Sequence, residues 1–465
     1  MPRFFVQNFG CRATQADGAS IERQLSNRGL TPAESPAHAD IVVLNTCTVT
    51  AAADHDARAA IRRVHRGNPE ARILVTGCYA QRAPQEVAAL PGVTWVVGNS
   101  HKHLVPEIAA PNGNLISAER LALSSPAFTT VGDIFAHTEL IAAPVFSSEE
   151  IAGKTRPNLK VQDGCNNRCA FCIIPSVRGQ SRSMRLDRVI EEAHALVAAG
   201  YKEIVLSGIN LGRWGRDFQP QQSFPELLQA LLERTDIQKL RISSVEPMDW
   251  SDELIALVAA SPRIAKHAHL PLQSGSDRIL RRMHRKYRPW HYAEKIRKIR
   301  EAMPDAAIGA DVMVGFPGET DELFEESRSF IERLPFTYLH VFTYSSRPGT
   351  ASAAMPDQVA VSTARERNRV LRELAARKNL EFRQSFVGRS LEVITLQAGD
   401  DASTEALSDN YLKVRVAGQL AANKKLAVEI HAVHSDGLFA GLPCKNQVDP
   451  FCGGAAPKVR SVSTS

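Results

Sequence analysis

The chain has 465 residues, of which 44% are hydrophobic and 23% are charged, and its formal net charge is +6 at pH 7. This is the composition of a globular protein that buries a substantial core, and the length predicts two or three domains. No apolar run approaches the length that a bilayer requires, so no membrane-spanning segment is expected.

The chain begins with MPRFFVQNFGCR, which holds a short apolar stretch and no cleavage-like segment, so no secretory signal is expected. We therefore expect a cytoplasmic protein, whose thiols are kept reduced. The eight cysteines are then expected to be metal ligands or catalytic groups rather than disulfides.

Three short runs in the first hundred residues end on a cysteine. RFFVQNFGC, DIVVLNTC and RILVTGC each read as a buried strand, and they close on Cys11, Cys47 and Cys78, the N-terminal trio. Helical patterns at 15–27 and 51–65 separate them, so the strands are expected to be parallel. The carboxyl ends of parallel strands meet at one edge of a sheet, where ligands bind, so the three cysteines should converge. The alternative is that they are small, inert core residues.

A stretch at about 124–157 with a Pro and Ser content typical of a linker precedes a longer alternation of strands and helices. Six strand-like runs in a row imply a partial (β/α)6 barrel with its chemistry at the carboxyl ends of the strands. The six runs are NLKVQDGC, EIVLSGIN, KLRISSVEP, KHAHLPLQS, AAIGADVMVGF and YLHVFTY.

Directly after the first barrel strand, Cys165, Cys169 and Cys172 form a second group, the barrel trio, with C-x3-C-x2-C spacing. A structural zinc ion takes four ligands, and IIPSVRG after Cys172 contains no His, Asp, Glu or Cys. A 4Fe–4S cubane held by three thiolates keeps one iron without a protein ligand. An open coordination position of this kind is where a substrate or cofactor binds.

The C-terminal part predicts a charged, Arg-rich helix at 361–382 followed by a small β domain. Its strand-like runs are SLEVITLQ, YLKVRVAG and KLAVEIHAVHSDGLFAGL. The tail from residue 446 is predicted to be disordered. Cys444 and Cys452, beyond the last strand, are interpreted as incidental, with a zinc site or an exposed redox pair as the alternative.

The stretch 278–300 concentrates positive charge, with ten Lys or Arg residues against Glu294 alone. Tyr287, Trp290 and Tyr292 are interleaved with these charges. The pattern fits either a solvated helical face or a surface that binds a polyanion such as RNA, and both interpretations stay open.

Around these cysteines the chain resembles the radical S-adenosylmethionine (SAM) methylthiotransferases. CNNRCAFCIIPSVRGQSRS, HLPLQSGSDRILRRMHRKY and DVMVGFPGETDE are similar to motifs of that family, and the similarity extends to about Leu442. The resemblance implies an N-terminal α/β domain at 1–123 and a partial barrel of radical SAM type at 151–360. It further implies a small β, TRAM-like RNA-binding domain at 383–442, before the predicted tail at 446–465.

The same resemblance implies two 4Fe–4S clusters and SAM as cofactors. Cys165, Cys169 and Cys172 would hold the cluster whose open iron SAM chelates, and Cys11, Cys47 and Cys78 would hold an auxiliary cluster that delivers sulfur. One SAM would supply a 5′-deoxyadenosyl radical and another would methylate the sulfur. An electron donor such as a flavodoxin or ferredoxin, and tRNA, would be the partners.

Three polar residues near the predicted barrel mouth are candidates for the SAM pocket. Ser244 and Glu246 end the third barrel strand, and Gln273 follows the fourth. Polar groups in that position suit the ribose and methionine ends of SAM. The alternative for each of them is loop capping.

The segment VVLNTCTVTAAADHDARAAIRR resembles the family branch that acts on N6-threonylcarbamoyladenosine next to the tRNA anticodon. That branch converts this nucleoside to its 2-methylthio derivative. The alternatives are the sister branches, which act on isopentenyladenosine in tRNA or on a ribosomal protein aspartate. A non-catalytic RNA-binding protein with structural zinc, to which His65 or His101 would add a fourth ligand, is a further alternative.

Overall fold

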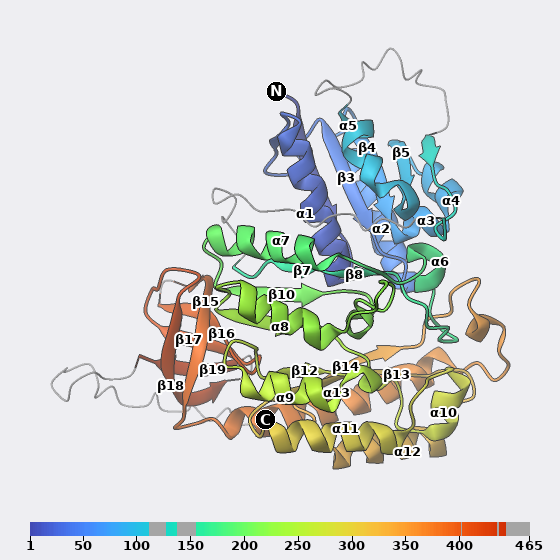
Figure 1. The fold of residues 1–465 in the computed structure, drawn as a ribbon. Coiled ribbons are helices and arrows are strands. Elements are labelled where there is room, and N and C mark those ends of the chain that lie inside the picture. The colour runs from blue at the N-terminus through green and yellow to red at the C-terminus, as the bar shows by residue number, and fades with distance from the viewer. Residues whose placement is uncertain (111–126, 137–154, 401, 435–436, 443–465) are drawn as a thin grey trace, which may run out of the picture. The chain divides into compact units, whose positions relative to one another are not determined.

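The N-terminal cysteines follow strands of one parallel sheet. In the computed structural model, which describes residues 1–110, 127–136, 155–400, 402–434 and 437–442, this sheet has the strand order β2-β1-β3-β4-β5-β6 (Figure 1). All of its strand pairs are parallel, as the sequence predicts. The strands are β1 (Arg3–Asn8), β2 (Thr31–Pro32), β3 (Ile41–Thr46), β4 (Arg72–Gly77), β5 (Val93–Gly98) and β6 (Phe128–Thr130).

Helices cover both faces of this sheet because its strands are apolar on both sides. The longer helices are α1 (Arg12–Asn27) and α2 (Ala51–Gly67). Ile61 of α2 packs with Val42 on one face, and Ile21 of α1 packs with Val43 on the other. Shorter helices complete the layers: α3 (Cys78–Arg82), α4 (Pro84–Ala88), η2 (Asn99–Leu104) and α5 (Val105–Ala109).

Six further strands form the predicted partial barrel. β7, β10 and β11 make one parallel sheet and β12, β13 and β14 another. Parallel bridges between Leu240 and Ile264 and between Ser244 and His269 join the two sheets. The strands are β7 (Asn158–Lys160), β10 (Glu203–Ser207), β11 (Lys239–Ile242), β12 (His267–His269), β13 (Ala307–Val314) and β14 (Tyr338–Thr343).

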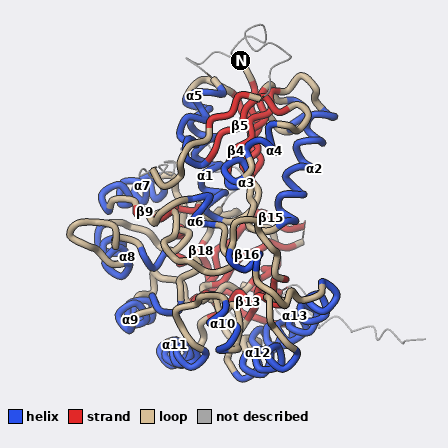
Figure 2. The backbone as a smooth tube through the Cα atoms, turned by 90° about the vertical axis from the view of Figure 1, so that its right-hand side faces the viewer, coloured by secondary structure: helices blue, strands red, loops and turns tan. Residues whose placement is uncertain are grey.

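An outer layer of helices covers the barrel strands (Figure 2). The helices pack through apolar stripes, and side-chain caps start several of them, such as the capping box of Ser223 and Glu226. The longer helices are α7 (Leu186–Ala198), α8 (Phe224–Arg234), α9 (Asp252–Ala260), α11 (Pro289–Ala302), α12 (Asp321–Arg333) and α13 (Val361–Gln384). The short helices α6 (Ile174–Arg178) and α10 (Asp277–Arg282) and the hairpin of β8 (Gln162–Asp163) and β9 (Arg182–Ser183) lie in the connections.

Chain contacts divide the protein into a unit of Met1–Phe382 and a unit of Arg383–Ser465. The second unit is a closed barrel with the order β15-β16-β17-β19-β18, which confirms the predicted small β domain. Its strands are β15 (Ser390–Asp400), β16 (Ser403–Ser408), β17 (Lys413–Ala417), β18 (Lys425–His434) and β19 (Gly437–Gly441). Cys444, Cys452 and the tail at 446–465 lie outside the described residues.

Several details differ from the sequence-based expectations, since the N-terminal sheet also contains β2 and β5, which the three cysteine-terminated runs did not predict. β6 lies within 124–157, the stretch interpreted as a linker, and it extends the N-terminal sheet by pairing with β5. β16 was missed because STEALS lacks the alternation of β-branched and polar residues that marks a strand. Among the described residues, no helix combines the length and the apolar character needed to cross a bilayer.

Candidate iron–sulfur site

The N-terminal trio converges at the carboxyl edge of the parallel sheet. Cys11 precedes α1, Cys47 directly follows β3, and Cys78 is the first residue of α3 after β4. Gly10 has φ +96°, and a Cβ there would lie 2.7 Å from the Cβ of Cys47, so the loop before Cys11 rests on Cys47. Gly77 likewise has φ +99° and would clash with the backbone of Thr46 if it carried a Cβ. The two glycines let neighbouring strand ends approach closely enough to gather the thiols.

Burial and crowding of these thiols keep Cys47 as a neutral thiol when no metal is bound. Cys47 and Cys78 are buried, whereas Cys11 is exposed. Burial and the neighbouring Cys78 raise the pKa of Cys47 to about 11. A thiol of this kind becomes a thiolate by exchanging its proton for a metal. Polar groups lie beside the sulfurs: Thr14 Oγ1 is 3.5 Å from Cys11 Sγ, and Asn99 Nδ2 is 3.5 Å from Cys78 Sγ.

The barrel trio occupies the loop between β8 and α6. Cys165 donates its backbone N–H to Gly179, and Cys172 donates its own to Cys169, so the loop folds back on itself. The sulfur of Cys165 has two donors nearby, the backbone nitrogen of Asn167 at 3.4 Å and Asn210 Nδ2 at 3.6 Å. Burial raises the pKa of Cys172 to about 12.

In neither trio do all three sulfur atoms lie within 4.8 Å of one another. Zn–S bonds are about 2.3 Å long, so two sulfurs on one zinc ion lie at most about 4.6 Å apart. Among the described residues, the one group of three His, Cys, Asp or Glu ligand atoms within 4.8 Å of one another is His269, Asp311 and His340. Neither cysteine trio forms such a group. A cubane, whose ligands bind different irons, accommodates the wider spacing.

The two histidines considered as zinc ligands lie elsewhere. His65 packs against Gly92, and His101 bonds to Ser100 Oγ at 3.0 Å while its ring lies against Gly132. Neither joins a group of ligand atoms with the N-terminal trio. The described contacts of these two histidines are therefore with residues other than the three cysteines.

The helix α6 brings the two trios together. Ile173, directly after Cys172, and Val177 form one buried apolar cluster with Cys78. Asn99 Nδ2 is 3.5 Å from Cys78 Sγ and donates to the carbonyl of Val177 at 2.8 Å. The same short helix thus borders both cysteine groups.

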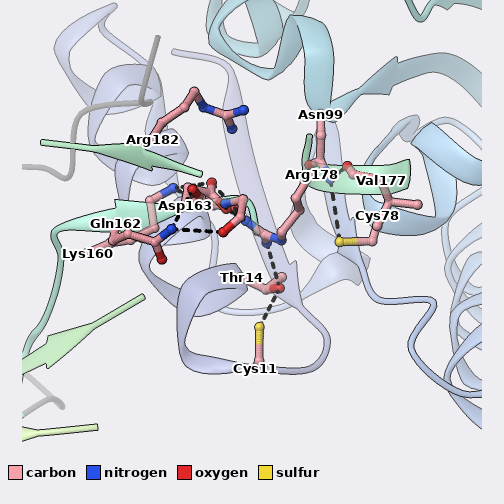
Figure 3. Close-up of polar contacts among 12 residues, drawn as sticks. Cys11, Thr14, Cys78, Asn99, Lys160, Gln162, Asp163, Val177, Arg178 and Arg182 are labelled. Carbon is pink, nitrogen blue, oxygen red and sulfur yellow. Dashed lines mark hydrogen bonds and ion pairs between the residues drawn. The ribbon is translucent and has the colours of Figure 1, made fainter. Parts of the chain in front are cut away.

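Arg178 of α6 belongs to a buried charge network that links α1 to the barrel, and its carboxylates are Asp17 and Asp163. Figure 3 shows Arg178, Lys160 and Asp163 of this network. Arg178 donates through Nη1 to both oxygens of Asp163, at 2.9 and 3.0 Å, and through Nη2 to Asp17 at 3.1 Å. Lys160 bonds to both carboxylates, and Lys102 lies 3.0 Å from Asp17. Asp163 also accepts the backbone N–H of Gly164, next to Cys165.

The three residues predicted to form the SAM pocket lie in different surroundings. Glu246 accepts from Arg285 Nη2 at 2.5 Å, and Arg285 Nη1 lies 3.2 Å from Cys169 Sγ, so Glu246 is tied to the barrel trio. Ser244 bridges to His269 of β12. Gln273 has φ +66° and bridges to Val312 of β13, which places it at the next strand connection.

Inside the barrel, three adjacent strands present a polar group that sequence reasoning missed. His269 Nε2 and His340 Nδ1 each lie 3.3 Å from Asp311 Oδ1. Their apolar neighbours, such as Ile308, Ala310 and Val312, belong to the core under the outer helices, so by strand alternation Asp311 faces the lumen. Burial raises the pKa of Asp311, but the two histidines lower it by more and hold it well below its usual range.

The basic stretch 278–300 is neither a uniform polyanion surface nor a uniform solvated face. Tyr287 and Tyr292 are buried and donate to backbone carbonyls, so they offer no stacking surface. Arg285 is buried beside Cys169, and Arg297 is paired with two glutamates. Exposed side chains remain at Arg278, Arg281, Lys286 and Trp290.

Arg178, Asp163, Asp17 and Arg285 are the functional candidates that the cysteine pattern does not reveal. Their partners lie far away in the sequence, 161 residues for the Arg178–Asp17 pair and 116 for Arg285 and Cys169. For Asp163, Arg178 and Arg285 the available signal was their occurrence within the quoted cysteine and basic motifs, whereas Asp17 lies in none of these motifs.

Two family models match this chain. The Radical SAM superfamily matches residues 159–331, and the uncharacterized protein family UPF0004 matches residues 3–98. The fold is similar to that of a radical SAM methyltransferase, TsrM from Kitasatospora setae, solved with cobalamin and a 4Fe–4S cluster. That similarity has a TM-score of 0.55 at 16% identity, over 76% of this chain and 77% of the other.

Sequence relatives cover nearly the whole chain. The threonylcarbamoyladenosine tRNA methylthiotransferase MtaB of Bacillus subtilis is 38% identical over 87% of this chain and 88% of its own length. MtaB of Aquifex aeolicus is 35% identical over 91% and 99%. A tRNA-2-methylthio-N(6)-dimethylallyladenosine synthase of Thermobifida fusca is 35% identical over 84% and 77%. With both cysteine trios in place on the matching fold, this chain belongs to the radical SAM methylthiotransferase family, whose cofactors are SAM and 4Fe–4S clusters.

Proposed function

We propose that this protein attaches a methylthio group to C2 of N6-threonylcarbamoyladenosine next to the anticodon of tRNA. The observation that carries the proposal is the packing of Cys78, one member of the N-terminal trio, against α6, the helix that directly follows the barrel trio. Sulfur delivery and hydrogen abstraction must act on the same carbon atom. Two sets of cysteines that border the same helix can place both reactions near one carbon atom.

In this proposal Cys165, Cys169 and Cys172 hold the radical-generating cluster, and Cys11, Cys47 and Cys78 hold the auxiliary one. SAM and the two clusters supply a 5′-deoxyadenosyl radical and a methylated sulfur. The protein supplies the thiols, of which Cys47 and Cys78 are buried, and N–H donors beside the sulfur of Cys165.

Ser244, Glu246 and Gln273 are proposed to bind SAM at the mouth of the barrel. Glu246 is supported best, because Arg285 joins it to Cys169. Glu246, Arg285 and Cys169 also line one small pocket together with Lys286. A carboxylate there suits the amine or ribose of SAM.

The polar group in the lumen favours a polar nucleoside substituent. His269 at the end of β12, Asp311 within β13 and His340 within β14 offer hydrogen-bond donors and acceptors. A threonylcarbamoyl group can use these partners, whereas an isopentenyl group would leave them unpaired. Sites built to bond a polar group reject an analogue that lacks it. These polar partners therefore support threonylcarbamoyladenosine over isopentenyladenosine as the substrate. Four relatives named for threonylcarbamoyladenosine also support it.

Reaction on tRNA implies a cytoplasmic enzyme that takes electrons from a small carrier such as a flavodoxin or ferredoxin. The small β unit and the exposed basic residues Arg278, Arg281 and Lys286 are the proposed RNA contacts. They support RNA over a ribosomal protein aspartate as the substrate.

Mass spectrometry of nucleosides tests the proposal directly. tRNA from cells lacking the gene should retain threonylcarbamoyladenosine and lack its 2-methylthio derivative, and the wild-type gene should restore it. A Cys47→Ala gene is the matched control, because it removes one N-terminal ligand and leaves the barrel trio intact. Loss of the isopentenyladenosine derivative instead would assign the chain to the sister activity.

A further inference from the structure

The buried charge network holds one more cation than carboxylates. Its carboxylates are Asp17 and Asp163, its cations are Lys102, Lys160 and Arg178, and each of the five is at most 6% exposed. The two lysines alone would balance the two carboxylates. Arg182, which also faces Asp163, adds positive charge rather than removing it. At least one positive charge is therefore left over in a buried place.

This excess charge lies beside the N-terminal trio. Arg178 Nη2 is 3.3 Å from Thr14 Oγ1, which is in turn 3.5 Å from Cys11 Sγ (Figure 3). Val177, the residue before Arg178, packs against Cys78. Burial lowers the pKa of Arg178, but Asp163, Cys78, Asp17 and Cys11 raise it well above its ordinary value, so the guanidinium stays charged. Arg178 thus faces two of the three thiols.

A buried charge is costly unless an opposite charge compensates it. A 4Fe–4S core in its 2+ state with three thiolates carries a net charge of about −1. We propose that Arg178 is the counter-charge of the auxiliary cluster, and that it sets the reduction potential of that cluster through its excess positive charge. The proposal rests on the assignment of this cluster to Cys11, Cys47 and Cys78.

The two signs of charge change should act in opposite directions. Reduction adds negative charge to a cluster, so a nearby cation raises its potential and a nearby carboxylate lowers it. Arg178→Gln should therefore lower the potential of the auxiliary cluster, and Asp17→Asn should raise it. We expect at least a tenfold change in the one-electron equilibrium for Arg178→Gln, which corresponds to about 59 mV.

The measurement is an EPR-monitored redox titration of the full-length protein with Cys165, Cys169 and Cys172 all changed to Ala. This background leaves the N-terminal trio as the cluster site, so its signal is read alone. Arg178→Lys keeps the charge and should retain most of the potential. Arg369→Gln on α13 removes an exposed guanidinium paired with Glu366 and Glu373, and it should leave the potential unchanged.

Each outcome decides the matter. Opposite shifts for Arg178→Gln and Asp17→Asn support the proposal, and so does loss of the cluster in Arg178→Gln with retention in Arg178→Lys. Unchanged potentials would overturn the proposal, because the charge of Arg178 would then have no effect on the cluster. Loss of the cluster in both Arg178 variants would also overturn it, because the shape of the side chain rather than its charge would then hold the cluster. If the protein without Cys165, Cys169 and Cys172 binds no iron at all, the assignment of a cluster to the N-terminal trio is wrong. That result can be told apart from a failure of the proposal about Arg178.

Discussion

Arg285 Nη1 lies 3.2 Å from the sulfur of Cys169 and donates toward it. The other end of the same guanidinium donates to Glu246 at 2.5 Å. A residue in a run of surface-like basic residues is thus the buried bridge between the barrel trio and the proposed SAM pocket. Its positive charge suits a thiolate-bound cluster on one side and a carboxylate on the other.

Replacing Arg285 should affect SAM chemistry more than RNA binding. Arg285→Ala leaves Glu246 without its partner and Cys169 without a donor, so SAM cleavage should fall at least tenfold. Arg285→Lys should restore part of the SAM cleavage, because lysine keeps the positive charge but lacks the two-pronged guanidinium that reaches Glu246 and Cys169 at once. Formation of 5′-deoxyadenosine without tRNA is the measurement, and Arg281→Gln on the exposed side of α10 is the control. Equal cleavage by Arg285→Ala and the wild type would contradict the bridge.

The two cysteine groups should be separable by their products. Reconstituted wild-type protein should bind about eight irons, and either Cys47→Ala or Cys165→Ala should bind about four. Cys47→Ala should still form 5′-deoxyadenosine but attach no methylthio group, whereas Cys165→Ala should do neither. Iron analysis and both product assays on one anaerobic sample make the test. Methylthiolated nucleoside at wild-type yield from Cys47→Ala would refute the two-cluster assignment.

Only the exposed part of the basic stretch should contribute to tRNA binding. Changing Arg278 and Lys286 to Gln should weaken tRNA affinity and flatten its salt dependence, by about 0.9 for each duplex phosphate that the protein no longer neutralises. Arg297→Gln is the matched control, because Glu294 and Glu301 already hold that guanidinium. Binding isotherms at several salt concentrations give the tRNA affinity and its salt dependence. If the salt dependence is the same for both variants, the whole stretch 278–300 is a solvated face that does not bind tRNA.

The polar group of His269, Asp311 and His340 in the barrel lumen should govern the choice of substrate rather than SAM cleavage. Asp311→Asn keeps the shape but removes the charge that holds His269 and His340. We expect kcat/KM for tRNA carrying threonylcarbamoyladenosine to fall by about tenfold to a hundredfold, the effect of losing one charged polar contact with the substrate. SAM cleavage without tRNA should stay within about twofold of wild type. A parallel loss in both assays would mean that Asp311 serves the SAM site or the fold instead.

Glu192 on α7 should make stability fall as pH rises. Burial raises its pKa to about 7, despite the nearby Arg188. The folded state therefore holds a proton that the unfolded state has released, and the unfolding free energy declines between about pH 4.5 and pH 7. Glu192→Gln removes this decline, so its stability relative to wild type should improve from pH 5.5 to pH 8 by on the order of 1–3 kcal/mol. Thermal unfolding midpoints of both proteins at the two pH values check this, and a constant difference would contradict it.

The sequence predicts the convergence of the cysteines but not their surroundings, for a physical reason. The ends of β1, β3 and β4 are marked by local apolar runs, and parallel topology then brings Cys11, Cys47 and Cys78 to one edge. The partners of Arg178 and Arg285 depend instead on tertiary packing of segments far apart in the chain. A run of basic residues does not distinguish a buried Arg285 from an exposed Lys286, because the fold of the connection between α10 and α11 decides which side chain points inward.

The closed barrel of the second unit limits how it can recognise a partner. Parallel pairing of β17 with β19 completes the ring, so every strand in it has two neighbours. A ring without open edges offers no backbone groups for strand addition, either to a peptide or to another copy of itself. Recognition by this unit must therefore come from outward-facing side chains and loops. Such contacts suit the irregular surface of a folded RNA better than an extended polypeptide.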